Sequence, residues 1–191
     1  MQEIKISRTW AMPNKWTFQI KPIRELLERY GVGKGWIDPF AGQYSPAEIT
    51  NDHRPDSNAK YHMDAVDFAK VLKGKFIGCV FDPPYSIHEV KRHYDSIDRK
   101  YDFKNDPTCS FKQVRDIIAP MVDTVIYFGW NTNAFGKKRG FEIVEILIVA
   151  HGGNRNDTLV TVERRNDESF TTATVKNLQT DLSTMLGEEN E

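Results

Sequence analysis

Cysteine is scarce in this chain of 191 residues, which contains only Cys79 and Cys109. Two cysteines cannot build a disulfide framework or a cysteine-based zinc site. The five histidines show no spacing that is typical of metal ligands. We therefore assign no metal site, and we expect a protein of a reducing compartment.

Long apolar runs and an excess of one charge are also absent. The longest apolar stretch, residues 143–150, is interrupted by Glu145 and is much shorter than the ~20 residues that a membrane span needs. The first five residues lack the basic and then apolar layout of a signal peptide, so we expect a cytoplasmic protein without a membrane partner. With 26 Lys and Arg against 27 Asp and Glu, the chain as a whole is not basic, and any contact with nucleic acid needs a local patch.

The near-neutral charge is the sum of two unequal parts. Residues 166–191 carry six acidic side chains and one lysine, whereas residues 1–165 have a net charge of +4. In the acidic part, Val175, Leu178, Leu182 and Leu186 recur at helical spacing. We expect residues 1–165 to form one domain, and residues 166–191 to be an acidic tail that is either helical or disordered.

Short apolar strands alternate with helical segments along residues 1–165, which is typical of an α/β domain with a mostly parallel sheet. The predicted helices cover residues 22–30, 64–72 and 110–119, and the predicted strands cover residues 36–38, 47–51, 61–63, 76–81, 124–128, 141–150 and 159–163. The gaps 39–46 and 52–60 are too short for crossover helices, so we expect shortened early crossovers. The last two strands are close in sequence, which favours an antiparallel pair at the sheet edge.

The most specific feature of the sequence follows the predicted strand 76–81. This loop reads Asp82-Pro83-Pro84-Tyr85, and in open α/β sheets ligands bind outside the carboxyl ends of the strands. Two successive prolines stiffen the chain and remove two backbone donors. Such a loop can direct a carboxylate, a backbone carbonyl and an aromatic face towards one planar ring that bears an exocyclic amine. The alternative interpretation is a rigid turn capped by an aspartate.

These four residues resemble motif IV of the S-adenosylmethionine-dependent amino methyltransferases, in the form that N6-adenine DNA methyltransferases use. The resemblance covers residues 10–165 and includes a compact group of phage or mobile-element methylases. It implies a Rossmann-like class I methyltransferase fold and a bacterial or phage-infected host cell. It further implies that Asp82, Pro83, Pro84 and Tyr85 are catalytic. In this scheme Tyr85 stacks on a flipped adenine, while Asp82 and the Pro83 carbonyl accept the N6 hydrogens.

The same resemblance implies that four stretches bind the cofactor S-adenosylmethionine. The expected cofactor-binding residues are Phe18, Asp38, Pro39, Phe40, Ala41, Asp52, Asp64 and Ala65. Three of them have structural alternatives, because Phe18 suits a core, Asp52 suits a turn and Asp64 suits a helix N-cap. The loop after Phe40 departs from the family pattern, since Gly42 is followed by Gln43 and not by a Gly-x-Gly continuation.

Two basic stretches are candidates for contact with nucleic acid. Lys91 and Arg92 belong to residues 86–106, a charged segment without a clean period in which basic and aromatic side chains alternate. The second stretch follows the strand 124–128 and contributes Asn131, Lys137, Lys138 and Arg139. The alternatives are a flexible lid for the first stretch and a solvated loop for the second.

The residues leave other activities open: an RNA adenine or N4-cytosine methyltransferase, or a non-catalytic module that binds nucleic acid or the cofactor. An N4-cytosine enzyme usually begins motif IV with serine, so Asp82 favours adenine. The motifs occupy most of residues 1–165, and no separate target-recognition region is visible. Recognition of DNA would therefore come from loops, from a homodimer or a separate specificity partner, or it would be weak.

Overall fold

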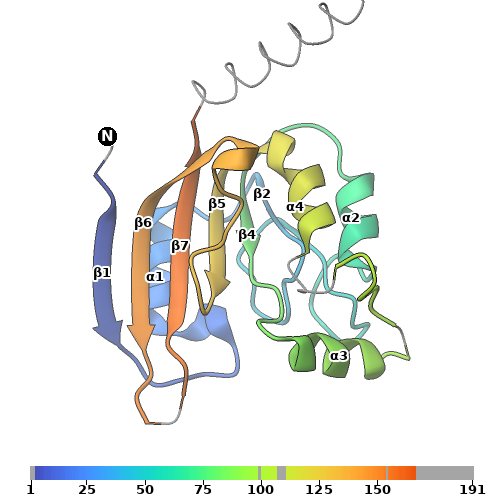
Figure 1. The fold of residues 1–191 in the computed structure, drawn as a ribbon, viewed down its shortest axis with the longest axis horizontal. Helices are drawn as coiled ribbons and strands as arrows, with labels where there is room; N and C mark the ends of the chain where they lie inside the picture. The colour runs from blue at the N-terminus through green and yellow to red at the C-terminus, as the bar shows by residue number, and fades with distance from the viewer. Residues whose placement is uncertain (1–2, 99, 107–110, 154, 167–191) are drawn as a thin grey trace, which may run out of the picture.

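A computed structural model describes residues 3–98, 100–106, 111–153 and 155–166 (Figure 1). Its strands are β1 Lys5–Trp10, β2 Trp36–Asp38, β3 Ile49–Thr50, β4 Phe76–Phe81, β5 Val122–Gly129, β6 Phe141–Ala150 and β7 Thr158–Arg165. Its α-helices are α1 Lys21–Arg29, α2 Ala65–Val71, α3 Ile87–Asp95 and α4 Lys112–Ile118, and its 3-10 helices are η1 Thr17–Gln19, η2 Ala119–Met121 and η3 Lys137–Arg139. The acidic tail predicted for residues 166–191 lies, except for Asn166, outside the described residues.

The seven strands form one sheet in the order β1-β6-β7-β5-β4-β2-β3. Strand β7 is antiparallel to both of its neighbours, and the other described pairs are parallel. The prediction of a mostly parallel sheet is confirmed, and β6 and β7 do form an antiparallel pair. That pair does not end the sheet, however, because the unpredicted strand β1 pairs in parallel with β6 and forms the edge.

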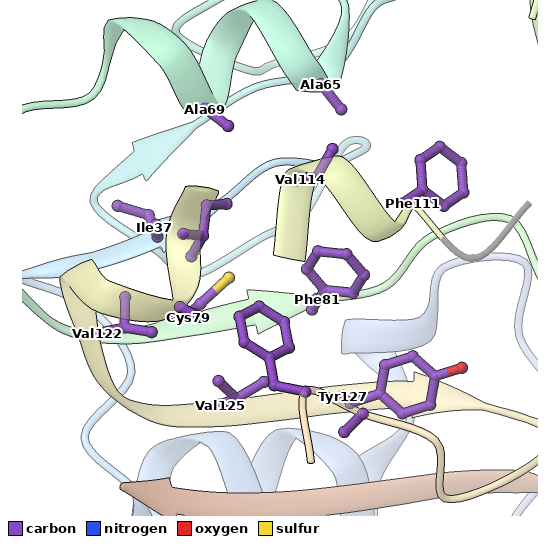
Figure 2. Packing of buried hydrophobic residues seen from close by; sticks show 14 of the residues in the cluster. Ile37, Ala65, Ala69, Cys79, Phe81, Phe111, Val114, Val122, Val125 and Tyr127 are labelled. Atoms are coloured by element: carbon purple, nitrogen blue, oxygen red, sulfur yellow. The ribbon is translucent and has the colours of Figure 1, made fainter. Parts of the chain in front are cut away.

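Helices cover both faces of the sheet and make three layers. Helix α1 lies on one face, and helices α2 and α4 lie on the other (Figure 1). Ala65 of α2 and Val114 of α4 face each other, and they belong to the same buried cluster as Ile37, Cys79 and Phe81 of the sheet (Figure 2). A second cluster of buried residues joins α1 to the opposite face. The described part of the chain contains no helix that is long and apolar enough to cross a membrane.

Strand β4 is central and is buried on both faces, which explains its nearly continuous apolar sequence. Gly78 stands opposite Trp36 of β2, and a Cβ atom at Gly78 would lie 2.5 Å from the Trp36 ring. Only glycine therefore lets the two strands approach around this indole. Cys79 is fully buried in β4.

The early crossovers are short, as predicted. Residues 39–48 and 51–64 contain no helix, and the expected strand at residues 61–63 is reduced to a single parallel bridge between Asn51 and Tyr61. Consequently the loops that follow β2 and β3 lie directly at the carboxyl edge of the sheet.

Helix α3 was not predicted, because its sequence is mostly charged. Its start carries a recognisable signal, since Ser86 accepts a hydrogen bond from the Glu89 N–H at 3.2 Å in the spacing of a capping box. Only Val90 and Tyr94 are buried along it. Helix α4 begins later than predicted, after Phe111, and Ser110, the first residue of the predicted helix, lies outside the described residues.

Candidate active site

A cavity of about 400 Å³ opens at the carboxyl ends of β2 and β4. This volume falls in the range of small-molecule sites. It brings together eleven of the residues that sequence reasoning selected. They are Phe18, Pro39, Phe40, Ala41, Asp52, Ala65, Asp82, Pro83, Pro84, Tyr85 and Arg92. Segments that are distant in the sequence therefore meet at one site.

The loop after β4 is held by hydrogen bonds at both of its ends. The Tyr85 hydroxyl donates to Asp82 Oδ1 at 2.5 Å, and the Tyr85 N–H donates to Glu89 Oε2 at 2.8 Å. Burial raises the pKa of Asp82 to about 6, although contacts with the Tyr85 and Thr17 hydroxyls act in the opposite direction. Burial, followed by the charge of Asp82, raises the pKa of the Tyr85 phenol well above its usual value. Asp82 is thus a carboxylate that changes protonation near neutral pH.

An aromatic residue beside this loop was absent from the predicted site. Trp130 comes directly after β5, is 45% exposed, and has its ring centroid 5.8 Å from that of Tyr85 in an edge-on arrangement. The predicted nucleic-acid residue Asn131 is its neighbour and is exposed, and its side-chain oxygen accepts a hydrogen bond from the Asn133 N–H at 2.9 Å. Exposed aromatic rings near a pocket offer stacking surface for a flat ligand.

Asp38 lies outside the cavity lining, and its expected contact with the cofactor stays a prediction. It is fully buried, and its two oxygens accept hydrogen bonds from the Phe40 N–H at 2.9 Å and the Ser45 hydroxyl at 2.6 Å. Burial raises the pKa of Asp38 to about 8. Asp38 therefore positions the loop that carries Pro39 and Phe40, which do line the cavity.

Asp52 lines the cavity and also stabilises the neighbouring loops. Its Oδ2 accepts a hydrogen bond from the Gly42 N–H at 3.0 Å, and its Oδ1 accepts one from the Arg54 N–H at 2.8 Å. The adjacent Asn51 is buried and was not predicted as a site residue. Its side chain donates to the Pro39 carbonyl at 3.2 Å and to the Met63 carbonyl at 3.1 Å. The loops after β2 and β3 are thus fastened to each other.

Asp64 is the N-cap of α2, in agreement with its structural alternative. It accepts a hydrogen bond from the Val66 N–H at 2.8 Å, and its other oxygen accepts one from the Tyr94 hydroxyl at 2.7 Å. Asp64 does not line the cavity, whereas its neighbour Ala65 does. The Tyr94 contact joins α3 to the start of α2 and holds α3 beside the cavity.

Several lining residues escaped prediction. They are Lys15, Trp16, Thr17, Gly42, Gln43, Tyr44, Asn51, His53, Arg54, Met63, Glu89, His93, Tyr94 and Phe111. His53 follows Asp52 directly, so its position after the second strand could have predicted that it lines the cavity. His93, Tyr94 and Glu89 belong to the unpredicted helix α3. Phe111 has a left-handed backbone (φ 50°), and its ring lies 4.7 Å from the ring of Phe40.

The second basic stretch does not join the site. Helix η3 precedes β6, which runs parallel to β5, so Lys137, Lys138 and Arg139 lie at the amino ends of these strands and the cavity lies at the carboxyl ends. Arg139 forms an ion pair with Asp116 at 2.7 Å and donates to the Phe135 carbonyl. In the first stretch Arg92 lines the cavity, whereas Lys91 is exposed on α3.

No protein-family model matches the sequence, and no curated protein matches it. Among solved structures, TrmN from Thermus thermophilus is similar over 77% of this chain at 14% identity, with a TM-score of 0.50. The match covers 49% of TrmN, so this chain spans about half of that protein. A putative methyltransferase from Streptococcus mutans in complex with SAH is 13% identical, and the match covers 74% of this chain and 96% of that chain with a TM-score of 0.45.

The putative methyltransferase yhhF from Escherichia coli is 11% identical, and the match covers 81% of this chain and 91% of that chain with a TM-score of 0.47. The likeness to TrmN and the observed strand order show the fold class, which is the Rossmann-like class I methyltransferase fold. The fold prediction is confirmed. A fold by itself does not define a substrate.

Proposed function

We propose that the chain transfers a methyl group from S-adenosylmethionine to the N6 amine of adenine in DNA. One observation carries the proposal: Asp82, Pro83 and Tyr85 line the same cavity as Phe40 and Asp52. The first three residues suit the target amine, and the last two suit the cofactor. The identity of Asp82 favours adenine, and the net charge of +4 on residues 1–165 supports a polyanionic substrate.

The residues at the cavity fit this cofactor. Asp52 offers carboxylate oxygens for ribose hydroxyls, while Phe40 and Ala65 offer apolar surface for the cofactor adenine. Asp38 contributes indirectly, because its hydrogen bonds hold the loop of Pro39 and Phe40 in place. When bound, S-adenosylmethionine would supply the methyl group as an electrophile and would leave as S-adenosylhomocysteine once the sulfur–methyl bond breaks, while the methylated amine would release one proton.

Asp82 acts on the target amine as a hydrogen-bond acceptor. With a pKa of about 6, it is largely ionised at pH 7 and above, and an ionised carboxylate accepts N–H bonds but donates none. The Pro83 carbonyl is the second acceptor, and accepting both hydrogens draws the nitrogen lone pair out of conjugation with the ring. The main contributions of the protein are therefore placement and electrostatics.

Tyr85 provides the stacking surface for the flipped base. Extrahelical exposure of a base costs a few kcal/mol, which stacking on an aromatic ring offsets in part. The Glu89 carboxylate holds the Tyr85 backbone, and the Asp82 carboxylate holds its hydroxyl. These two contacts set the ring in a defined orientation before the substrate arrives.

The variant Asp82→Ala tests the catalytic role. It should abolish methylation of a defined duplex and leave S-adenosylmethionine binding nearly unchanged by calorimetry, because in this proposal Asp82 contacts the target amine and not the cofactor. Asp67→Ala, an exposed carboxylate on α2, is the matched control and should keep full activity. Methylation by Asp82→Ala at a rate near that of the wild type would refute the mechanism.

The substrate is tested by expression in a host that lacks adenine methylation. Direct sequencing of the host DNA should reveal N6-methyladenine in one sequence context. If the DNA is unmodified while calorimetry shows cofactor binding, the DNA assignment is wrong, and RNA from the same cells is assayed for the modification. No binding of S-adenosylmethionine would instead indicate a non-catalytic module.

A further inference from the structure

Part of one sheet face has no covering layer among the described residues. Helices α2 and α4 cover β2, β4 and β5, and the loop of residues 134–136 extends this cover to β7. There Glu163 accepts hydrogen bonds from the Phe135 N–H at 2.8 Å and the Gly136 N–H at 3.0 Å. Beyond this loop, no helix lies in front of β6 and β1, whereas α1 lies behind the sheet (Figure 1).

The uncovered surface is apolar. Residues that pair across strands point to the same face, so the face is defined by the pairs Ile6–Ile146, Ile148–Leu159 and Ile143–Glu163. Trp10 joins it through its pairing with Ala150. We call this surface the apolar strip, which comprises Ile6, Trp10, Ile143, Ile146, Ile148 and Leu159. Ile6 is 65% exposed and Trp10 is 61% exposed, and the other four residues of the strip are half-buried. A contiguous apolar patch of this kind usually marks a contact surface.

We propose that residues 175–186 of the same chain form a helix that packs on the apolar strip. This segment contains one apolar stripe in an otherwise polar sequence: Val175, Leu178, Leu182, Met185 and Leu186. Their spacing of three and four residues places them on one side of a helix. Gly187 follows the stripe, where a helix commonly ends.

The linker of residues 167–174 is long enough for residues 175–186 to reach the apolar strip, and the helix matches the strip in length. Asn166 is the last described residue, and its N–H donates to the Gly140 carbonyl at 2.8 Å, directly before β6 begins. The tail therefore starts next to the strip. Residues 167–174 can span up to ~27 Å. A helix of residues 175–186 is ~18 Å long, and the distance along β6 from Ile143 to Ile148 is ~17 Å.

Charge favours the tail over a second copy of the domain. Arg8 is exposed and pairs with Ile148, so it stands on the strip's face. Two copies of the strip that faced each other would bring two Arg8 side chains into one apolar contact. The tail instead offers Asp181 beside its stripe and carries a net charge of −5 over residues 167–191. Its covalent connection also raises its effective concentration at the strip.

Hydrogen exchange followed by mass spectrometry on the full chain tests the proposal. Backbone amides of residues 175–186 should exchange at least about tenfold more slowly than those of an unstructured peptide. The double variant Leu178→Asp/Leu182→Asp should abolish this protection. Its matched control is Thr180→Asp/Thr184→Asp, which adds the same charge on the opposite side of the helix and should keep the protection. Both variants lie outside the described domain, so they leave its core intact.

A variant of the strip completes the test. Ile6→Asp changes an exposed side chain on the edge strand and should also abolish the protection of residues 175–186. Exchange of the tail at unstructured rates in the wild-type chain would overturn the proposal. Protection that disappears on dilution together with a dimer, measured by light scattering, would also overturn it, because a second copy would then cover the strip. The result is independent of methyl transfer.

Discussion

The hydrogen bond between the Tyr85 hydroxyl and Asp82 makes a sharp prediction about pH dependence. At 2.5 Å this contact stabilises the ionised carboxylate, so Tyr85→Phe should raise the pKa of Asp82 above its value of about 6. A hydrogen bond to a charged group contributes about 1.5–3 kcal/mol. Because one pKa unit corresponds to about 1.4 kcal/mol, the pKa should rise by about 1–2 units. At pH 7 the ionised fraction would then fall from about 90% to between about 50% and 10%.

Two measurements test this prediction. The carboxyl carbon of Asp82, followed by NMR, gives the pKa without any need for activity. The pH profile of kcat/KM for methylation should show its acidic limb shifted to higher pH by the same amount, with partial recovery of the rate at pH 9. Tyr44→Phe is the control, since Tyr44 lines the cavity, is 48% exposed, and should leave the Asp82 titration unchanged. An Asp82 midpoint that stays at about 6 or falls in Tyr85→Phe would refute the reasoning.

Three further predictions concern stability and charge. Glu145→Ala should lower the free energy of unfolding by about 1–3 kcal/mol in urea titrations, because it removes the buried carboxylate that Arg29 binds at 2.8 Å, while the half-exposed Arg29 regains contact with water; a loss below about 0.5 kcal/mol would contradict this. Although burial acts to raise the pKa of Glu145, hydrogen bonds led by that from Arg29 lower it to about 2, so its contribution should be lost as pH falls from 4.5 towards 2. The pKa of Asp38 is raised to about 8, so its ionisation favours the unfolded state and the wild type loses stability as pH rises towards 8. The free energy of unfolding of Asp38→Asn should therefore increase relative to that of the wild type by roughly 1.4 kcal/mol per pH unit between pH 5 and 7. Curves of unfolding free energy against pH that run parallel for the two proteins would refute this. Removal of the acidic residues 167–191 should strengthen DNA binding several-fold at low salt, because these residues repel the phosphates, and the gain should disappear at high salt. An unchanged affinity in binding titrations would show that the tail does not repel DNA.

Local sequence signals were sufficient for the elements with strong patterns. The helix predicted for residues 22–30 forms as α1: Pro22 suits a first turn, and Ile23, Leu26 and Leu27 recur at helical spacing and are buried. The apolar run of residues 76–81 likewise predicted a strand, which forms as β4 over the same residues. Strand β1 and helix α3 lacked such patterns, since β1 has only one covered face and α3 buries just Val90 and Tyr94. Their formation depends on the surfaces against which they pack.

The candidate site likewise has a part that the sequence predicted and a part that it did not. Sequence alone determined that Asp82-Pro83-Pro84-Tyr85 follows a buried strand, and in a parallel sheet that places the loop at the ligand-binding edge. It did not determine the role of Asp38, which is the last residue of its own strand β2. The tertiary structure buries Asp38 beneath the loop, where it binds the Phe40 N–H and the Ser45 hydroxyl.

Only the tertiary structure decided which polar groups meet. The bond from Tyr94 to Asp64 joins residues 30 positions apart, and Arg29 and Glu145 are 116 positions apart. It also placed Lys137 at the end of the sheet opposite the cavity, although Lys137 follows β5 in the sequence as the loop 82–85 follows β4. Periodicity and spacing are local properties, and they determine where a strand or helix forms. The distances between side chains in a site depend on strand order and loop packing, which arise only when the whole core assembles.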